Sequence, residues 1–282
     1  MSTGLAARPS PGRTRSQRRR IVNSAWYLLT HTRLLGRVTW SDIGRRYAGS
    51  VLGVSWVVIA PALSIGLYAV VYRLIFRVHV PGLNGWDYVL YIFAGLVPYL
   101  MTAEALSVGV SSVIVNRSVL NNTVFPIDLT PVKAVLSAQG SMLVGVIATA
   151  AGVIAVGRAH WTILLVPVVW ALQILALIGV TWVLSLVNVV LRDLQNLVTL
   201  LLVLLMIASP IAYTPAMVPQ SLQWVLYVNP LAYYVTTYQK LLVLGQLPDP
   251  VTAILLVVIS AGLFFLGGFF FARTKSVMLD YV

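Results

Sequence analysis

The chain has 282 residues, of which 59% are hydrophobic and only 9% are charged. Because a soluble domain carries about 25% charged residues, lipid is the expected solvent for most of this chain. The sequence contains no cysteine, which excludes a disulfide framework and a thiolate metal site. Lysine and arginine number 19 against 7 acidic residues. In so apolar a chain this excess indicates membrane topology, and nucleic acid is not an expected partner.

The N-terminal region is predicted to precede the membrane domain in two parts. Residues 1–22 contain six arginines among Ser, Pro, Gly and Thr and are too polar to form a core, so they are predicted to be a disordered basic tail. Residues 23–53 mix Trp26, Leu35 and Trp40 with arginines at roughly helical spacing. Because Trp and Arg together are typical of an amphipathic helix at headgroup level, this segment is predicted to be a cytoplasmic interface helix.

Residues 54–271 are predicted to form an all-α domain of six transmembrane helices, since about 20 apolar residues cross the hydrocarbon. The stretch 214–250 is rich in aromatic residues but interrupted by five prolines. It is predicted to form two short re-entrant helices between the fifth and sixth spans, where broken backbone is tolerated if protein or a cavity surrounds it. The predicted spans are 54–76, 88–113, 134–156, 163–190, 197–213 and 251–271.

Positive charge predicts the orientation of these spans. If residues 1–53 lie inside the cell, the inner segments hold 15 lysines and arginines and the outer segments hold 4. Cytoplasmic segments of membrane proteins carry such an excess. Both termini, including a tail at 272–282, are therefore expected in the cytoplasm, and the stretch 214–250 is expected on the opposite side.

Small residues occupy the join between the interface helix and the first span, where a basic stretch ends and an apolar one begins. They are Gly49, Ser50 and Gly53. We predict that they form a hinge between the interface helix and the first span. The sequence leaves two alternatives open: the hinge moves, or its small residues only let two helices pack closely.

The chain lacks a nucleotide-binding P-loop, which requires a lysine directly after a glycine. None of its three lysines follows a glycine, so any ATP must be bound by another polypeptide. The cytoplasmic loop between the second and third spans is the predicted contact for such an ATPase, and an ordinary polar turn is the alternative. The residues predicted to couple are Asn116, Arg117, Val119, Leu120, Phe125 and Pro126, where the proline would end a short helix.

Six motifs follow one another along residues 33–275. They are Arg46-Tyr47 through Trp56 to Pro61, Gly95-Leu96-x-Pro98-Tyr99 with Glu104-Ala105-Leu106, Asn116 to Phe125-Pro126, Arg192-Asp193-Leu194, Ser209-Pro210-Ile211-x-Tyr213, and Asn229-Pro230-Leu231. In this order they resemble the membrane subunit of an ABC-2 type polysaccharide exporter, the family of O-antigen, teichoic acid, capsule and cell-wall galactan permeases.

The resemblance implies six spans, an interface helix, a cytoplasmic coupling helix at 116–125 and two extracytoplasmic re-entrant helices. It implies a second copy of the chain and two ABC ATPase subunits as partners, with ATP and Mg²⁺ bound in the ATPase and no cofactor bound by this chain. The first and fifth spans would line a passage for a polyprenyl-pyrophosphate-linked glycan. The chain would lie among the lipids of the bacterial inner membrane.

Two charged positions have alternative interpretations. Glu104 is the only glutamate and lies within a predicted span, where an acidic side chain is costly unless paired or protonated. It is either a buried structural carboxyl, hydrogen-bonded to a serine or to a neighbouring span, or part of a proton or ion pathway, and the structural interpretation is favoured. Arg192 and Asp193 form either a local ion pair or a positional element of a cytoplasmic gate, and the positional role is favoured.

Aromatic and basic side chains supply candidates for contact with a substrate. Trp and Tyr gather at membrane interfaces for amphipathic reasons alone, but aromatic rings also stack on sugar rings. Arginine binds phosphate through its planar fork, so arginines near the first span are candidates for the entry of a lipid pyrophosphate. The path candidates are Trp56, Tyr68, Tyr72, Tyr213, Tyr233, Tyr234 and Tyr238, and the entry candidates are Arg33, Arg37, Arg45 and Arg46.

The sequence therefore favours a permease that exports a lipid-linked polysaccharide, of O-antigen or cell-wall galactan type, with energy from a partner ATPase. An ABC-2 exporter of a drug or simple lipid would share the fold. An intramembrane enzyme acting on lipid-linked sugars is less favoured, because the seven acidic residues are scattered along the chain. A channel is disfavoured because the sequence lacks a ring-forming polar motif.

Overall fold

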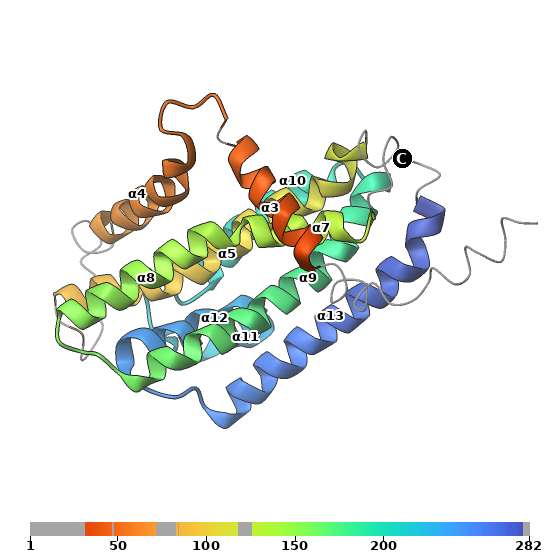
Figure 1. The fold of residues 1–282 in the computed structure, drawn as a ribbon. Coiled ribbons are helices and arrows are strands. Elements are labelled where there is room, and N and C mark those ends of the chain that lie inside the picture. The colour runs from red at the N-terminus through yellow and green to blue at the C-terminus, as the bar shows by residue number, and fades with distance from the viewer. Residues whose placement is uncertain (1–31, 47, 72–82, 84, 118–125, 279–282) are drawn as a thin grey trace, which may run out of the picture.

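The computed structural model describes residues 32–46, 48–71, 83, 85–117 and 126–278. These residues form helices joined by turns, and none of them lies in a β-strand (Figure 1). The predicted all-α fold is therefore confirmed for this part of the chain. The main helices are α3 (Thr32–Arg46), α4 (Trp56–Val70), α5 (Trp86–Val115), α7 (Leu129–Ser137), α8 (Gln139–Ala155), α9 (Val166–Val190), α10 (Leu194–Ala208), α11 (Gln223–Val228), α12 (Pro230–Gln239) and α13 (Pro250–Met278).

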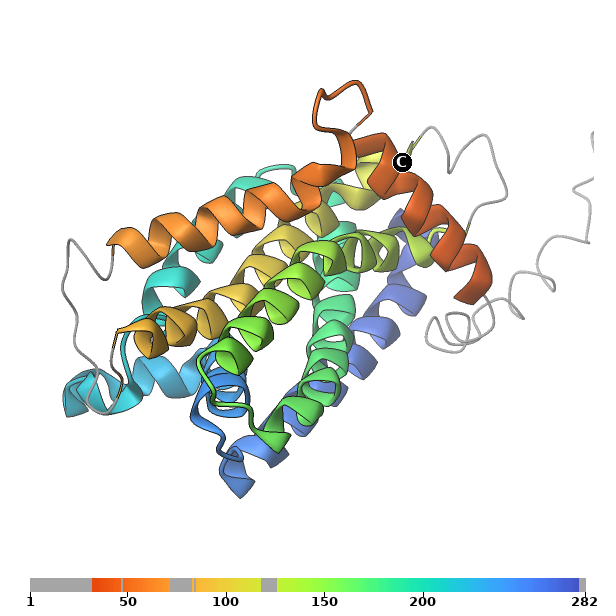
Figure 2. The same ribbon diagram turned by 60° about the vertical axis from the view of Figure 1, so that its left-hand side comes forward.

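Helix α5 is the centre of the bundle, and α7, α8, α9, α10 and α12 pack around it (Figure 2). Its side chains Ile92, Leu96 and Met101 are fully buried. Within its most apolar window 78% of the residues are buried inside the chain, against 39% or less in the other long apolar helices. Helix α5 therefore supports the fold, while the helices around it present apolar side chains outward.

Four helical segments are long and apolar enough to cross a membrane: Trp86–Val115, Leu129–Ala155, Trp161–Val190 and Pro250–Lys275. They coincide with the second, third, fourth and sixth predicted spans. Helices α4 and α10 are apolar but shorter, and they lie within the first and fifth predicted spans. The end of the first predicted span, 72–76, lies outside the described residues. The total of six spans stays a prediction.

Among the described helices, α9 and α13 share the most extensive contact, and each has a glycine there. A Cβ atom on Gly179 of α9 would overlap the Leu263 carbonyl, and one on Gly267 of α13 would overlap the backbone of Gly179. Trp182, fully buried on α9, adds a ring contact with Phe271 at 6.2 Å between centroids. Small residues that let two backbones approach are typical of helix pairs in lipid.

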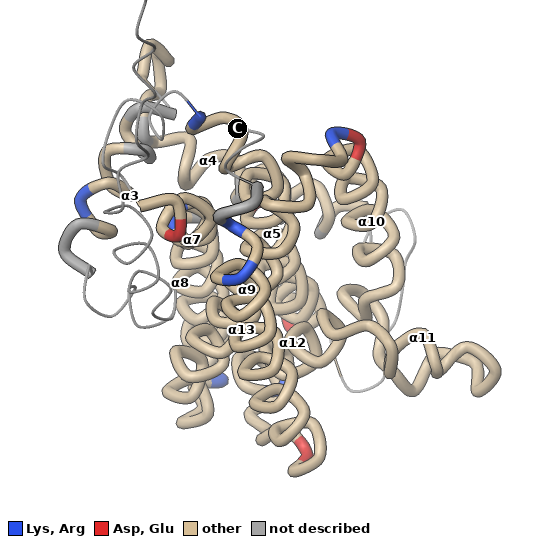
Figure 3. The backbone as a smooth tube through the Cα atoms, turned by 90° about the vertical axis from the view of Figure 1, so that its right-hand side faces the viewer, with Lys and Arg blue, Asp and Glu red and all other residues tan. Residues whose placement is uncertain are grey.

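The described charged residues lie mostly toward two opposite ends of the bundle (Figure 3). We call the end with α3, the start of α7 and the last turns of α13 the basic end. At the other end, the far end, Arg158 pairs with Asp87 at 3.0 Å and Lys240 pairs with Asp249 at 2.7 Å. Segregation of charge to two ends matches a bundle whose middle lies in hydrocarbon.

Helix α3 lies across the basic end and packs against α7. Leu35 and Thr39, four residues apart, are buried, whereas Arg37 is exposed and Trp40 is 76% exposed. Residues four apart share one face of a helix, so α3 has one packed and one open face. A helix is thus present at 32–46, within the predicted segment 23–53, and its place at the membrane interface stays a prediction. Residues 1–31, with the predicted basic tail, lie outside the described residues.

Two helices of different burial occupy the 214–250 stretch. In α11 none of the residues is buried, whereas α12 buries most of its side chains against α5 and continues as a π-helical turn over Lys240–Leu244. The prediction of two short helices between α10 and α13 agrees with this arrangement. That they enter the membrane from outside stays a prediction.

Candidate functional site

The Ser209-Pro210 and Asn229-Pro230 motifs meet at the start of α12. Asn229 Nδ2 donates to Ser209 Oγ at 2.9 Å, while the Leu231 backbone N–H donates to Asn229 Oδ1 at 3.0 Å. Asn229 is thus the N-cap of α12, the position where an amide oxygen best satisfies a free backbone donor. Its other side-chain bond fixes the start of α12 to the end of α10.

A buried glutamine at the end of α12 makes the second link. Gln239 is 1% exposed, and its Nε2 donates to the carbonyls of Pro210 at 2.9 Å and Ile211 at 3.0 Å. A Cβ atom on Gly95 of α5 would lie 2.6 Å from this nitrogen, so the Gly95-x-x-Pro98 motif leaves room for the amide. Sequence reasoning did not identify Gln239, because a single uncharged polar residue gives no local signal.

Three tyrosine hydroxyls attach α10, or the segment that follows it, to neighbouring helices. Tyr88 and Tyr99 of α5 donate to the carbonyls of Ala212, at 2.9 Å, and Leu202, at 3.2 Å. Tyr68 of α4 donates to Met206 Sδ at 2.8 Å. The last contact joins the first and fifth predicted spans, which the family resemblance places beside the passage.

The other described path candidates have separate surroundings. The Tyr213 hydroxyl folds back to the Ala208 carbonyl at the end of α10, at 3.1 Å. Tyr233 donates to the Tyr227 carbonyl at 3.0 Å. Tyr234 and Tyr238 are buried in the core, and the Tyr234 hydroxyl lies 2.7 Å from Ser260 Oγ of α13. The structure does not gather these rings along one surface, and Tyr72 lies outside the described residues.

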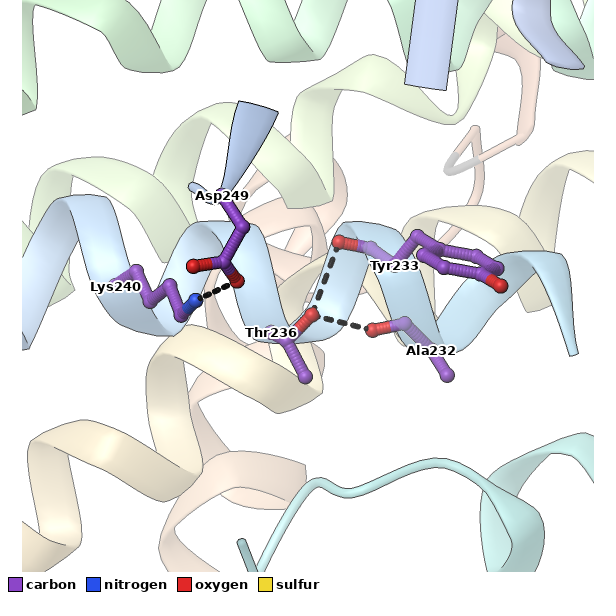
Figure 4. A network of polar contacts seen from close by, with 5 residues as sticks. All are labelled: Ala232, Tyr233, Thr236, Lys240 and Asp249. Atoms are coloured by element: carbon purple, nitrogen blue, oxygen red, sulfur yellow. Dashed lines mark hydrogen bonds and ion pairs between the residues drawn. The ribbon is translucent and has the colours of Figure 1, made fainter. Parts of the chain in front are cut away.

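The π-helical turn that follows α12 is joined to the start of α13 by an ion pair, and α12 itself carries a hydrogen bond from a side chain to its backbone (Figure 4). Lys240 Nζ donates to Asp249 Oδ2 at 2.7 Å, and Thr236 Oγ1 donates to the Ala232 carbonyl at 2.9 Å. The Lys240 contact lowers the pKa of Asp249, first through the hydrogen bond and then through the lysine's charge. This pair fixes the connection from α12 to α13.

The predicted hinge residues adopt conformations that favour glycine. Gly49 has φ of +82° and Gly53 has φ of +51°, in the left-handed region that side chains with a Cβ rarely adopt. A Cβ atom at either position would meet nothing within 4 Å. The glycines therefore serve the backbone turn, and no helix among the described residues packs against them. That they form a hinge stays a prediction. Ser50 Oγ accepts a hydrogen bond from Trp56 Nε1 at 3.0 Å, which connects the turn to the start of α4.

Most of the predicted coupling loop, residues 118–125 with Val119, Leu120 and Phe125, lies outside the described residues. Its first side is fixed at Asn116, whose Nδ2 donates to the Ser112 carbonyl at 2.7 Å and whose Oδ1 accepts from Lys133 of α7 at 3.3 Å. Arg117 is exposed. On the other side, the Pro126 carbonyl accepts from the Leu129 backbone N–H at 3.1 Å, in the turn that starts α7.

Asp128 joins this second side of the loop to two further helices. Lys275 Nζ of α13 lies 2.8 Å from both carboxylate oxygens, and Trp182 Nε1 of α9 donates to the Asp128 carbonyl at 3.1 Å. Sequence reasoning missed this cluster. Asp128 and Lys275 are 147 residues apart, and single charges at such a separation carry no periodic signal.

The remaining charged candidates are placed as follows. Glu104 is half-buried on α5. Arg192 and Asp193 are exposed at the turn between α9 and α10, and neither belongs to an ion pair within the described part of the chain. The geometry therefore gives no support to a local pair between them. Of the entry candidates, Arg37 is exposed on α3, and the side chains of Arg33, Arg45 and Arg46 lie outside the description.

Comparison with known proteins identifies the family of this fold. Residues 34–243 match the family model of the ABC-2 type transporter. The O-antigen export system permease protein RfbA of Klebsiella pneumoniae is 28% identical over 219 residues, covering 76% of this chain and 82% of the relative. RfbA of Myxococcus xanthus is 26% identical over 223 residues, covering 77% and 82%. Since the family match spans well over half of the sequence, the chain belongs to the ABC-2 type transporter family.

Proposed function

We propose that the chain is the permease subunit of an ATP-driven exporter that moves a polyprenyl-pyrophosphate-linked polysaccharide, of O-antigen or cell-wall galactan type, out of the bacterial cytoplasm. The observation that carries this proposal is the similarity to two O-antigen export permeases over 82% of their length. As a multi-pass membrane protein without a P-loop in its sequence, the chain supplies the path, and a separate ABC ATPase supplies the energy.

Exposed apolar side chains on α10 support a passage formed by two copies of the chain. Leu197, Leu200, Leu204 and Ile207 are each 59–67% exposed, and their spacing of three and four residues places them on one side of the helix. The Tyr68–Met206 contact puts α4 beside α10. A second copy placed against these two helices would enclose a path between them.

The charge distribution supports an orientation with the basic end in the cytoplasm. Arg37, Arg117, Arg192, Arg273 and Lys275 belong to segments at this end, whereas both described cations of the far end are paired with aspartates. An excess of positive charge on one side is the pattern of cytoplasmic segments. The loop at 116–126 would then face an ATPase, and α11 and α12 would form the re-entrant pair on the outside.

The subunit composition provides the test of this proposal. The purified chain is expected to hydrolyse no ATP, and a separately encoded ABC ATPase is expected to co-purify with it from native membranes in detergent. ATP turnover that persists in the isolated chain would contradict the two-component mechanism. A control purification of an unrelated six-span protein from the same membranes should recover no ATPase.

A further inference from the structure

We propose that Asp128 and Lys275 form a positioning pair that transmits displacement of the 116–126 loop to α13. This inference rests on the proposed function, in which that loop contacts the ATPase. It adds the C-terminal helix, which lies at the opposite end of the sequence, to the elements that respond to ATP.

The geometry of the pair suits a mechanical link. Lys275 Nζ lies 2.8 Å from both oxygens of the Asp128 carboxylate, and the two side chains are only 19% and 10% exposed. By contrast, Asp249 in the Lys240 pair is 70% exposed. Because a largely buried pair is screened much less by salt and water than an exposed one, solvent weakens the Asp128–Lys275 attraction less than it weakens the Lys240–Asp249 attraction.

The pair also joins two helix termini of opposite polarity. Asp128 is the N-cap residue of α7, and Lys275 lies in the last turn of α13. An acid at a helix N-terminus and a cation at a helix C-terminus are each stabilised by the helix dipole. The contact is therefore favourable for both helices, beyond the attraction of the two charges.

Helix α7 is connected to the residues on both sides of the loop. Lys133 of α7 contacts Asn116 before the loop, and Asp128 lies two residues after Pro126. A push on the loop therefore displaces the start of α7, whichever side it reaches first. Lys275 and the indole of Trp182, which bonds the Asp128 carbonyl at 3.1 Å, then carry that displacement to α13 and α9.

Helices α9 and α13 pack at backbone contact around Gly179 and Gly267. In the proposed link, a displacement at Lys275 is shared by these two closely packed helices. Farther along α13, Ser260 Oγ lies 2.7 Å from the Tyr234 hydroxyl of α12. The link thus extends from the loop to the helix that the proposed function places on the outer side of the membrane.

The test compares two ion pairs at opposite ends of the molecule, in the full chain with its co-purified ATPase. Asp128→Asn and Lys275→Gln remove the link, and Lys275→Arg keeps its charge. Asp87→Asn and Arg158→Gln are the matched controls, because they remove an ion pair of 3.0 Å at the far end. The readouts are ATP turnover of the purified complex and glycan on the surface of cells, compared at equal amounts of folded chain.

We expect Asp128→Asn and Lys275→Gln to lower surface glycan at least about fivefold, the low end of typical coupling between sites, while ATP turnover stays unchanged. The double variant should be no worse than either single one, because both remove the same interaction. Lys275→Arg should export at close to the wild-type level, because it keeps the positive charge opposite Asp128. A role in stability alone would not separate ATP turnover from export in this way.

Equal export by the Asp128 and Asp87 variants would overturn the inference. If the single variants accumulate poorly, the double variant Asp128→Asn/Lys275→Gln decides, because it leaves no unpaired buried charge. Normal export by an accumulated double variant would also overturn the inference. Failure of the proposed function is distinguishable, because the unmodified complex would then place no glycan on the cell surface.

Discussion

Several family motifs mark backbone requirements at single residues. Gly95 leaves room for the Gln239 amide, and Asn229 caps α12 while it bonds Ser209. Gly49 and Gly53 provide two backbone conformations with positive φ. These residues are small or polar because a turn, a cap or a close approach requires it. They set the backbone path and the positions of helices, and none of them needs to contact a substrate to account for the motif.

The Lys240–Asp249 pair predicts a dependence of stability on pH. Its hydrogen bond lowers the pKa of Asp249 below the ordinary value of 3.8. The pair therefore stabilises the fold fully above that value, and the contribution is lost as the pH falls through the lowered pKa. The thermal midpoint of the wild type should exceed that of Asp249→Asn at neutral pH, and the difference should vanish in acid. A difference that persists unchanged in acid would contradict this assignment.

At the scale of helices, the long apolar runs were predictable and the interior partners were not. The predicted span 88–113 lies within α5, and the predicted span 163–190 lies within the segment Trp161–Val190, which ends with α9. These spans were predictable because about 20 consecutive apolar residues are a strong signal. The third window is interrupted near Ala138, between α7 and α8. Hydropathy does not report such a break, since both parts are apolar.

The site was less predictable because its contacts join distant parts of the chain. Gln239 reaches Pro210 and Asp128 reaches Lys275, and these pairings depend on how the helices pack. The aromatic residues illustrate the same limit. Composition marks Tyr234 and Tyr238 as candidates for a sugar path, whereas packing places both in the core.

The close contact of α9 and α13 predicts a large effect from a small substitution. Gly179→Ala adds a Cβ atom that overlaps the Leu263 carbonyl, and overpacking of this kind costs about 1–3 kcal/mol. Gly262→Ala on α13 is the matched control, because a Cβ atom there meets nothing within 4 Å. Thermal unfolding in detergent should show a lower midpoint for Gly179→Ala only. Equal midpoints for the two variants would show that the helices are not in contact at Gly179.

At the scale of the whole molecule, the chain has two polar ends and an apolar middle (Figure 3). The basic end holds both sides of the predicted coupling loop, helix α3 and the last turns of α13. The far end holds the connection from α12 to α13, fixed by the Lys240–Asp249 pair. Helix α5 joins the two ends through the core, so a displacement at one end can reach the other through packed helices.

The most direct measurement of the central claim is the membrane leaflet that holds the lipid-linked glycan when the chain is depleted. Inverted membrane vesicles expose the inner leaflet to a sugar-specific oxidant or lectin, and intact cells expose the outer surface. Depletion is expected to accumulate glycan in the inner leaflet and to remove it from the cell surface, and restored expression should reverse both changes. Glycan that still reaches the surface at normal levels after depletion would contradict the proposed export function.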